Sequence, residues 1–173
     1  MMRLNVAAPV GIAAAALAGF LLIDRGGAES AVASGAVPIV ATGTRFSCTP
    51  VAVWDGDGPI WCAEGPRVRL EGIAAQEIDG TCRPGHPCPK ASGLQSRDYL
   101  VRLLGGPKGV LSTGHVAVNG PRLYCVSGGN AKGKRTAAFC SAPRVGDLSC
   151  SMVKGGYALR WSRYGGDGVC RQP

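Results

Sequence analysis

Short stretches of alternating apolar and polar residues follow one another after residue 45, which is typical of β-strands with one buried face. Strands are predicted over residues 46–54 and 59–63, and a third over Val68–Leu70 followed by Ile73. The sequence Asp55–Gly58 separates the first two and has the composition of a tight turn. These three strands are therefore predicted to form a meander.

Helical spacing of apolar residues occurs at two places. Residues 92–104 carry leucines and Tyr99 on one side, and Gly105-Gly106-Pro107 ends the pattern. A second helix is predicted from the N-cap residue Asp147 through Lys154, ending at Gly155-Gly156.

Further strands are predicted over Val110–Val118, Arg122–Val126 and Thr136–Cys140. Asn119-Gly120 favours a hairpin between the first two, and a basic loop, Lys132–Arg135, precedes the third. The 27 glycines and 12 prolines also favour a loop-rich β fold over a helical bundle. This order of elements is the one expected of an α+β protein built on a five-stranded Greek-key OB barrel with about two helices.

The start of the chain has the pattern of an export signal. An uncharged run from Val6 to Ile23 follows Arg3, and Ala31-Val32-Ala33 offers a cleavage site of small residues. The predicted organisation is a signal peptide over residues 1–33, a short linker over 34–45 and one domain over 46–173. Because the run has 18 residues, retention as an N-terminal membrane anchor is the alternative. Either version places the domain outside the cytosol, in the periplasm or the medium.

Eight cysteines in so short a chain argue against a cytosolic enzyme and favour an oxidising compartment. Eight cysteines allow about 105 complete pairings. Positions along the chain favour Cys82 with Cys88, Cys125 with Cys140 across one loop, Cys150 with Cys170, and therefore Cys48 with Cys62. His86 between two cysteines suggests zinc, but the close cysteine pairs typical of zinc sites are missing, so a disulfide is preferred.

The net charge of +8 predicts a polyanionic partner. The charges of the predicted signal segment cancel, so the exported domain keeps the whole excess. Among the aromatic residues of the basic tail, Tyr157, Trp161 and Tyr164 are expected chiefly in core packing, with stacking on nucleic-acid bases as the alternative. His115 has no evident partner and is expected to be an ordinary strand residue.

Several motifs in order resemble the staphylococcal nuclease, or thermonuclease, family. They are Asp55-Gly56-Asp57-Gly58, then Arg69-Leu70 leading to Ile73-Ala74-Ala75-Gln76-Glu77, then the loop Lys132–Arg135, and the segment Met152–Ala158. The resemblance covers about residues 46–164. It implies the OB fold and a hydrolase, an endonuclease acting on DNA or RNA with calcium or another divalent cation.

The resemblance also implies roles for individual residues. Arg69 and Arg135 correspond to the two phosphate-binding arginines, Glu77 to the catalytic glutamate and Asp57 to a calcium ligand, with Asp55 as a supporting carboxylate. The planar guanidinium suits two-point contact with phosphate oxygens, and hard carboxylate oxygens suit calcium.

The sequence departs from the family pattern at Ala74, which takes the place of a second calcium-binding aspartate. Calcium binding is therefore expected to be weaker than in the family. Lys132, Lys134 and Tyr164 are further candidates for contacts with the nucleic acid, and the protein is expected to act as a monomer. Two alternatives are a catalytically reduced OB module that binds nucleic acid or another polyanion, and a disulfide-rich structural protein of the cell envelope.

Overall fold

The structure is a computed structural model, and it describes residues 37–171. Within these residues the protein is α+β, with a curled mixed sheet, two α-helices and four disulfides, as expected from the sequence at this level. The described residues contain no helix of the length and apolar character needed to cross a bilayer. The predicted signal segment lies outside the described residues.

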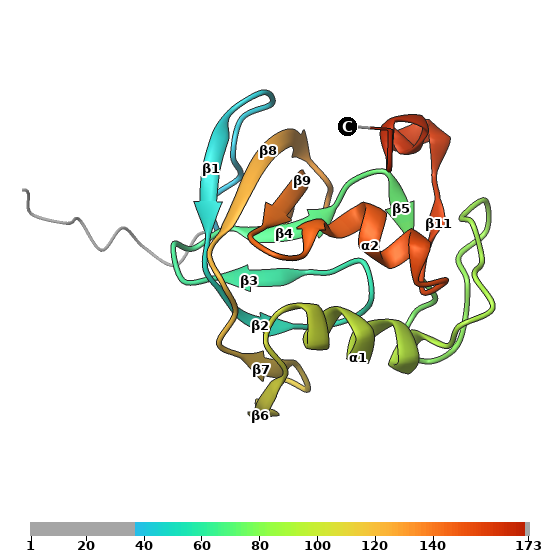
Figure 1. Cartoon of the computed structure of the whole chain (residues 1–173), viewed down its shortest axis with the longest axis horizontal. Helices are drawn as coiled ribbons and strands as arrows, with labels where there is room; N and C mark the ends of the chain where they lie inside the picture. The colour runs from blue at the N-terminus through green and yellow to red at the C-terminus, as the bar shows by residue number, and fades with distance from the viewer. Residues whose placement is uncertain (1–36, 172–173) are drawn as a thin grey trace, which may run out of the picture. The chain divides into compact units, whose positions relative to one another are not determined.

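Within the described residues the large sheet holds nine strands, more than the five-stranded barrel expected from the sequence. Along it lie β1 (Arg45–Cys48), β8 (Leu123–Asn130), β9 (Thr136–Ala142), β4 (Arg67–Leu70), β3 (Ile60–Cys62), β2 (Pro50–Val53), β7 (Val116–Val118) and β6 (Pro107–Val110), while β10 (Gly146–Asp147) pairs with β9 (Figure 1). The pairing of β4 with β9 is parallel and the others are antiparallel. Since only Thr49 separates β1 from β2, the strand at one end of this order continues into a strand near its other end.

The predicted meander is confirmed as β2, β3 and β4, with the Asp55–Gly58 turn between the first two. The third predicted strand is divided, because the chain turns at Gly72, whose φ of +78° favours glycine. Beyond that turn, β5 (Ile73–Ala74) pairs with β11 (Leu159–Arg160) in a separate two-stranded sheet.

The hairpin predicted at Asn119-Gly120 is wrong. β7 pairs with β2 and β6, whereas β8 pairs with β1 and β9. The predicted strand Val110–Val118 actually contains a turn, in which Gly114 N donates to Leu111 O and Leu111 N donates to His115 O. Asn119-Gly120 is instead a connection, and Gly120 N donates to Pro50 O.

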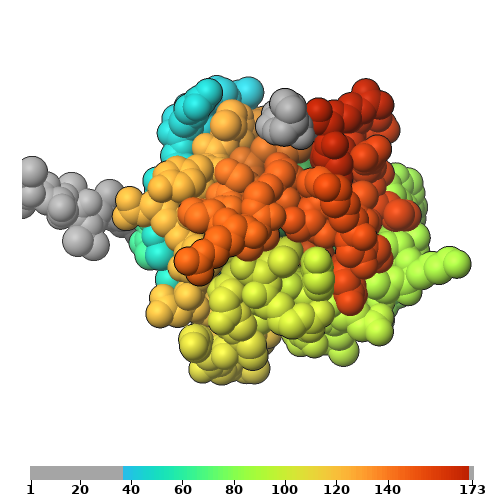
Figure 2. Space-filling model, viewed as in Figure 1, coloured from blue at the N-terminus to red at the C-terminus, as the bar shows by residue number. Residues whose placement is uncertain are grey.

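Both predicted helices are confirmed, as α1 (Gly93–Leu103) and α2 (Leu148–Lys154). Ser92 and Gln95 form a reciprocal capping box on α1, and the carboxylate of Asp147 accepts from Cys150 N at the start of α2. Figure 2 shows the surface of the segments around α1 and α2 side by side in yellow-green and orange. Two short 3-10 turns, Ser162–Tyr164 and Gly166–Gly168, follow β11.

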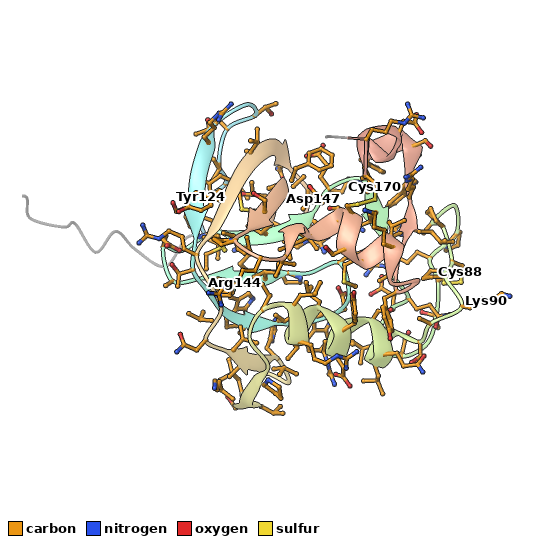
Figure 3. All side chains as sticks on the ribbon, viewed as in Figure 1. Cys88, Lys90, Tyr124, Arg144, Asp147 and Cys170 are labelled. Atoms are coloured by element: carbon orange, nitrogen blue, oxygen red, sulfur yellow. A yellow bond between two sulfur atoms is a disulfide. The ribbon has the colours of Figure 1, made fainter. Side chains whose placement is uncertain are left out.

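The four disulfides join the pairs expected from the sequence, and all eight cysteines are bonded. Cys48–Cys62 and Cys125–Cys140 lie largely within the buried core. Cys82–Cys88 closes an irregular loop at the edge of the domain, where Figure 3 shows Cys88 and Lys90 on the side away from Tyr124 and Arg144. The bonded cysteines agree with an oxidising environment.

Candidate phosphate-binding site

The turn between β2 and β3 brings two carboxylates into a nearly buried corner. Asp57 N donates to the Oδ1 of Asp55 at 3.1 Å, which fixes the turn. The Oδ2 of Asp57 accepts from Arg69 Nη2 at 2.7 Å and from Ala75 N at 3.1 Å. Only 14% of the Arg69 side chain and 10% of the Asp57 side chain are exposed, so this is a buried ion pair. The fold itself compensates the charge of Asp57.

The two carboxylates are difficult to ionise together. Burial raises the pKa of Asp55 well above its usual value, and the neighbouring Asp57 adds to this rise. Burial also raises the pKa of Asp57, while Arg69 and the N–H of Ala75 oppose that rise. We conclude that Asp57 keeps its charge through Arg69 and that Asp55 holds the proton more readily.

Arg69 lies on β4 and reaches toward the small sheet. Its Nη1 donates to Ile73 O at 3.4 Å, and its guanidinium lies 5.6 Å from the centre of the Trp161 ring. The register of β5 with β11 places Ala74 opposite Leu159, immediately before the chain reaches Trp161. The small sheet therefore brings an aromatic ring from the tail to the arginine.

Arg135 ends the loop between β8 and β9. The loop bends sharply because Lys132, Gly133 and Lys134 all have positive φ. Arg135 Nε donates to Lys132 O at 3.2 Å and Nη2 donates to Ala131 O at 3.4 Å, so backbone carbonyls hold the guanidinium. Among residues 37–171, no carboxylate forms an ion pair with it. Burial lowers the pKa of Arg135, and the like charge of Arg69 lowers it further.

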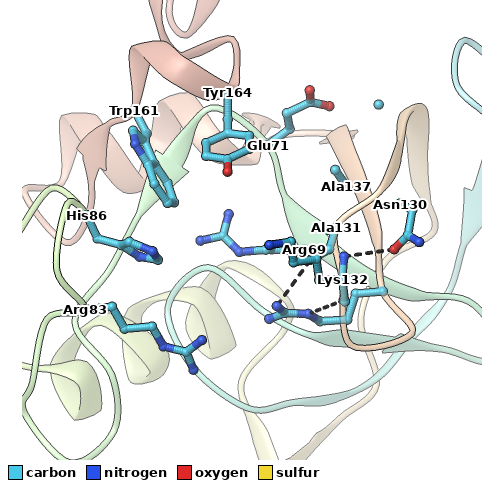
Figure 4. A pocket seen from close by; sticks show the side chains of 12 residues that line it. Arg69, Glu71, Arg83, His86, Asn130, Ala131, Lys132, Ala137, Trp161 and Tyr164 are labelled. Atoms are coloured by element: carbon cyan, nitrogen blue, oxygen red, sulfur yellow. Dashed lines mark hydrogen bonds between the residues drawn. The ribbon is translucent and has the colours of Figure 1, made fainter.

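A cavity of about 430 Å³ opens between these arginines and the tail (Figure 4). Its cationic residues are Arg69, Arg83, Lys132 and Arg135. Arg69 and Arg135 thus face the same space from different strands of the sheet.

Three rings line the same cavity. They are His86 from the Cys82–Cys88 loop, Trp161 and Tyr164. The ring centres of His86 and Trp161 are 4.1 Å apart, and those of Trp161 and Tyr164 are 4.4 Å apart. Burial lowers the pKa of His86, and Arg69 and Arg83 lower it further. The expected core packing of the tail aromatics holds for Tyr157, which stacks on Tyr99 against the core. Trp161 and Tyr164 line the cavity instead.

Glu77 does not line the cavity but contacts it through Arg83. The Oε1 of Glu77 accepts from Arg83 Nε at 2.8 Å, and the two side chains are 28% and 63% exposed. An exposed ion pair of this kind contributes about 0–1 kcal/mol, so either partner can exchange it for a stronger one.

The structure brings together most of the residues chosen from the sequence. Arg69, Arg135, Lys132 and Tyr164 line one cavity, and Asp57 is bonded to Arg69. Lys134 is exposed and outside the cavity lining.

The cavity residues that were not foreseen as parts of a site include Glu71, Arg83 and His86, and Trp161 was expected in the core, with base stacking only as the alternative. Glu71 had a usable signal in the sequence, because it follows Arg69 by two positions, the spacing of residues on one face of an extended chain, although β4 ends at Leu70. His115 was also misjudged, because it lies between the rings of Trp54 and Trp61, with Thr113 Oγ1 3.0 Å from its Nδ1.

A metal site is only partly provided by side chains. Within residues 37–171 no three His, Cys, Asp or Glu side chains are grouped as metal ligands. Asp55 and Asp57 supply the hard oxygens that calcium prefers, but Arg69 already occupies one oxygen of Asp57. Ala74 supplies no side-chain oxygen and is completely buried.

Searches with protein-family models and among curated proteins find no match to this chain.

Proposed function

We propose that the protein is an exported nuclease that hydrolyses phosphodiester bonds of DNA or RNA in the cavity beside Arg69 and Arg135. The observation that carries this proposal is the guanidinium of Arg135, which lines the same cavity as Arg69 and forms no ion pair with a carboxylate among the described residues. An anion placed between two like charges relieves their repulsion. A phosphodiester oxygen pair suits two planar guanidinium groups.

Charge compensation by the arginines is expected to matter most in the transition state. As water attacks the phosphorus, negative charge accumulates on the non-bridging oxygens, and fixed cations stabilise it without reorganising. Backbone carbonyls hold Arg135, and Asp57 holds Arg69, so both guanidinium groups are oriented before the substrate arrives.

Glu77 is the proposed base. The phosphate attracts Arg83, which lines the cavity, and the weak ion pair between Arg83 and Glu77 opens. The released carboxylate accepts a proton from the attacking water, whose oxygen bonds to phosphorus while the bond to the leaving oxygen breaks. The proton then passes to the leaving oxygen through solvent.

Calcium, or another divalent cation, is proposed as a weakly held cofactor. The free oxygens of Asp55 and Asp57 would hold it, with water and a phosphate oxygen as further ligands. A cation there would polarise the phosphate and also stabilise the ionised form of Asp55.

The connectivity supports an OB barrel as the finer description of the fold. Counting β1 and β2 as one bent strand across Thr49, the ring runs through β3, β4, β9 and β8 and returns to β1. This gives five strands. The third and the last in chain order, β4 and β9, pair in parallel. We also propose that the protein acts as a monomer in the periplasm or the medium.

The test is a cleavage assay of the oxidised protein on plasmid DNA and on RNA, with calcium or with a chelator. Glu77→Gln should lower the cleavage rate about 100-fold or more while leaving binding in place, because general-base catalysis contributes at least this much. Asp98→Asn, which removes an exposed carboxylate on α1, is the matched control and should cut at the wild-type rate. Cleavage that persists unchanged in Glu77→Gln would refute the assigned base, and equal cleavage with chelator would refute the metal.

A second candidate function, a binding module without catalysis, is favoured by one specific observation. The proposed base and one proposed cation ligand are both ion-paired with arginine, Glu77 with Arg83 and Asp57 with Arg69. Binding of nucleic acid without cleavage under any divalent cation would establish this alternative.

A further inference from the structure

Glu71 is an unexpected carboxylate in a cavity lined mainly by cations and rings. It lies two residues after Arg69, just beyond β4, and lines the cavity with it. Among residues 37–171, the side chain of Glu71 forms no hydrogen bond and no ion pair, although cationic side chains share the cavity. Burial alone raises its pKa, with no hydrogen bond or neighbouring charge opposing the rise. Its two oxygens are therefore free to accept hydrogen bonds from a ligand.

The residue facing Glu71 is small, and it has to be small. A Cβ built on Gly128 would overlap the carboxylate of Glu71, so glycine at this position leaves room for the oxygens. Ala131 and Ala137 continue the same lining with short side chains. This part of the cavity is therefore open to a flat group lying along the sheet.

The two kinds of charge lie at different ends of the cavity. Figure 4 shows the guanidinium of Arg69 and the carboxylate of Glu71 directed away from each other, with Trp161 and Tyr164 along the wall beside them. This arrangement matches a nucleotide. The cations suit its phosphate, the aromatic rings suit the face of its base, and the carboxylate suits the hydrogen-bonding edge of the base.

We propose that Glu71 reads the edge of the nucleobase and that the cavity prefers guanine. This inference rests on the proposed function, because it places the phosphate on Arg69 and Arg135. The two oxygens of a carboxylate accept two parallel hydrogen bonds, and guanine carries two adjacent donors on its pairing edge, N1–H and the N2 amino group. Adenine and cytosine present one amino group beside an acceptor. Uracil and thymine present one N–H between two carbonyl oxygens, which a carboxylate repels.

The test is a calorimetric titration of the full oxidised protein with the 5′-monophosphates of guanosine, adenosine, cytidine and uridine at pH 8, well above the usual titration range of a carboxyl group. Guanosine monophosphate should bind about tenfold more tightly than uridine monophosphate, as expected for a two-point contact with a base edge. Glu71→Gln replaces one acceptor oxygen by a donor at nearly constant size, so the preference for guanine should disappear, and uridine monophosphate should bind at least as tightly as before because the repelling carboxylate is gone.

Gly128→Ala is a second, independent variant. The added methyl group displaces the carboxylate of Glu71 without changing the charge of the cavity, so this variant should also lose the preference for guanine. Melting temperatures establish that each variant is folded.

Three outcomes overturn the proposal, and they differ in what else they overturn. Equal binding of all four nucleotides by the wild type refutes base reading but keeps the phosphate site. An unchanged guanine preference in folded Glu71→Gln assigns the preference to other residues. Failure of the wild type to bind any nucleotide refutes the proposed function together with this inference.

Discussion

Arg69 and Arg135 line the same cavity, but their guanidinium groups have different bonding partners. Arg69 is bonded to the buried Asp57, so its charge is matched within the fold. Among residues 37–171 the side chain of Arg135 donates to the carbonyls of Ala131 and Lys132 and forms no ion pair, so its guanidinium is oriented without a bonded carboxylate. An ion pair and a pair of backbone carbonyls can both fix an arginine, but the ion pair offsets part of the charge of Arg69, whereas the carbonyls leave Arg135 without a bonded carboxylate.

The two regions should therefore differ in what they contribute. The ion pair of Asp57 with Arg69 is expected to contribute mainly to the stability of the domain, because breaking a buried pair leaves an uncompensated charge. The guanidinium of Arg135 is expected to contribute mainly to ligand binding, because a charge without an ion pair adds little to folding and attracts phosphate.

The largest expected effect is on stability. Arg69→Ala should lower the free energy of unfolding by about 3 kcal/mol, because Asp57 loses its cation in a nearly buried site. Arg135→Ala should cost less than about 1 kcal/mol, since it removes hydrogen bonds at a partly exposed loop. Denaturant unfolding of both variants in chelator measures the difference. Equal losses of stability in the two variants would contradict the difference between a charge matched within the fold and a charge left for a ligand.

A smaller effect is expected at Asp55. Its pKa in the folded protein lies above the usual 3.8, so the folded state binds more protons than the unfolded state in the range above pH 3.8, and stability falls as pH rises through that range. Asp55→Asn keeps an acceptor for Asp57 N and avoids this loss. In chelator, the variant should melt at a higher temperature than wild type at pH 7 and at the same temperature below pH 3.8.

The same melting-temperature measurement with added calcium tests whether Asp55 binds a cation. If Asp55 supports a cation, millimolar calcium should raise the melting temperature of wild type and leave that of Asp55→Asn unchanged. An equal rise in both proteins would remove Asp55 from the cation site.

The smallest expected effect is a pH dependence of binding at His86. The pKa of this ring lies below the usual 6.5 in the free protein, and a bound phosphate backbone should raise it. Affinity for an oligonucleotide without terminal phosphates should therefore increase as pH falls from 7.5 to 5.5. His86→Gln should flatten this dependence, whereas His115→Gln, which removes a ring outside the cavity, should preserve it.

Local signals predicted much of the fold. Ser92 and Asp147 begin the two helices as their side-chain chemistry requires, and the paired cysteines lie close along the chain. The Asn119-Gly120 hairpin failed because turn chemistry is local, whereas β8 gains a longer ladder by pairing with β1 and β9.

The candidate site was predictable only where chain order carried information. Arg69 and Arg135 were chosen through the order of motifs, and the parallel pairing of β4 with β9, which sets Arg69 opposite Ala137, brings them to one cavity. His86 and Trp161 come from an irregular loop and from the tail, whose positions depend on distant packing. No periodicity in the sequence reports such contacts.

The most direct test of the central claim is the salt dependence of oligonucleotide binding by wild type, Arg135→Ala and Arg45→Ala. Arg45 is an exposed residue of β1 outside the cavity, so both variants lose the same charge. Arg135→Ala should weaken binding about tenfold and reduce the slope of log affinity against log salt by about one, while Arg45→Ala should change neither. Equal losses in the two variants would mean that net charge alone attracts the nucleic acid, and would contradict a phosphate site at Arg135.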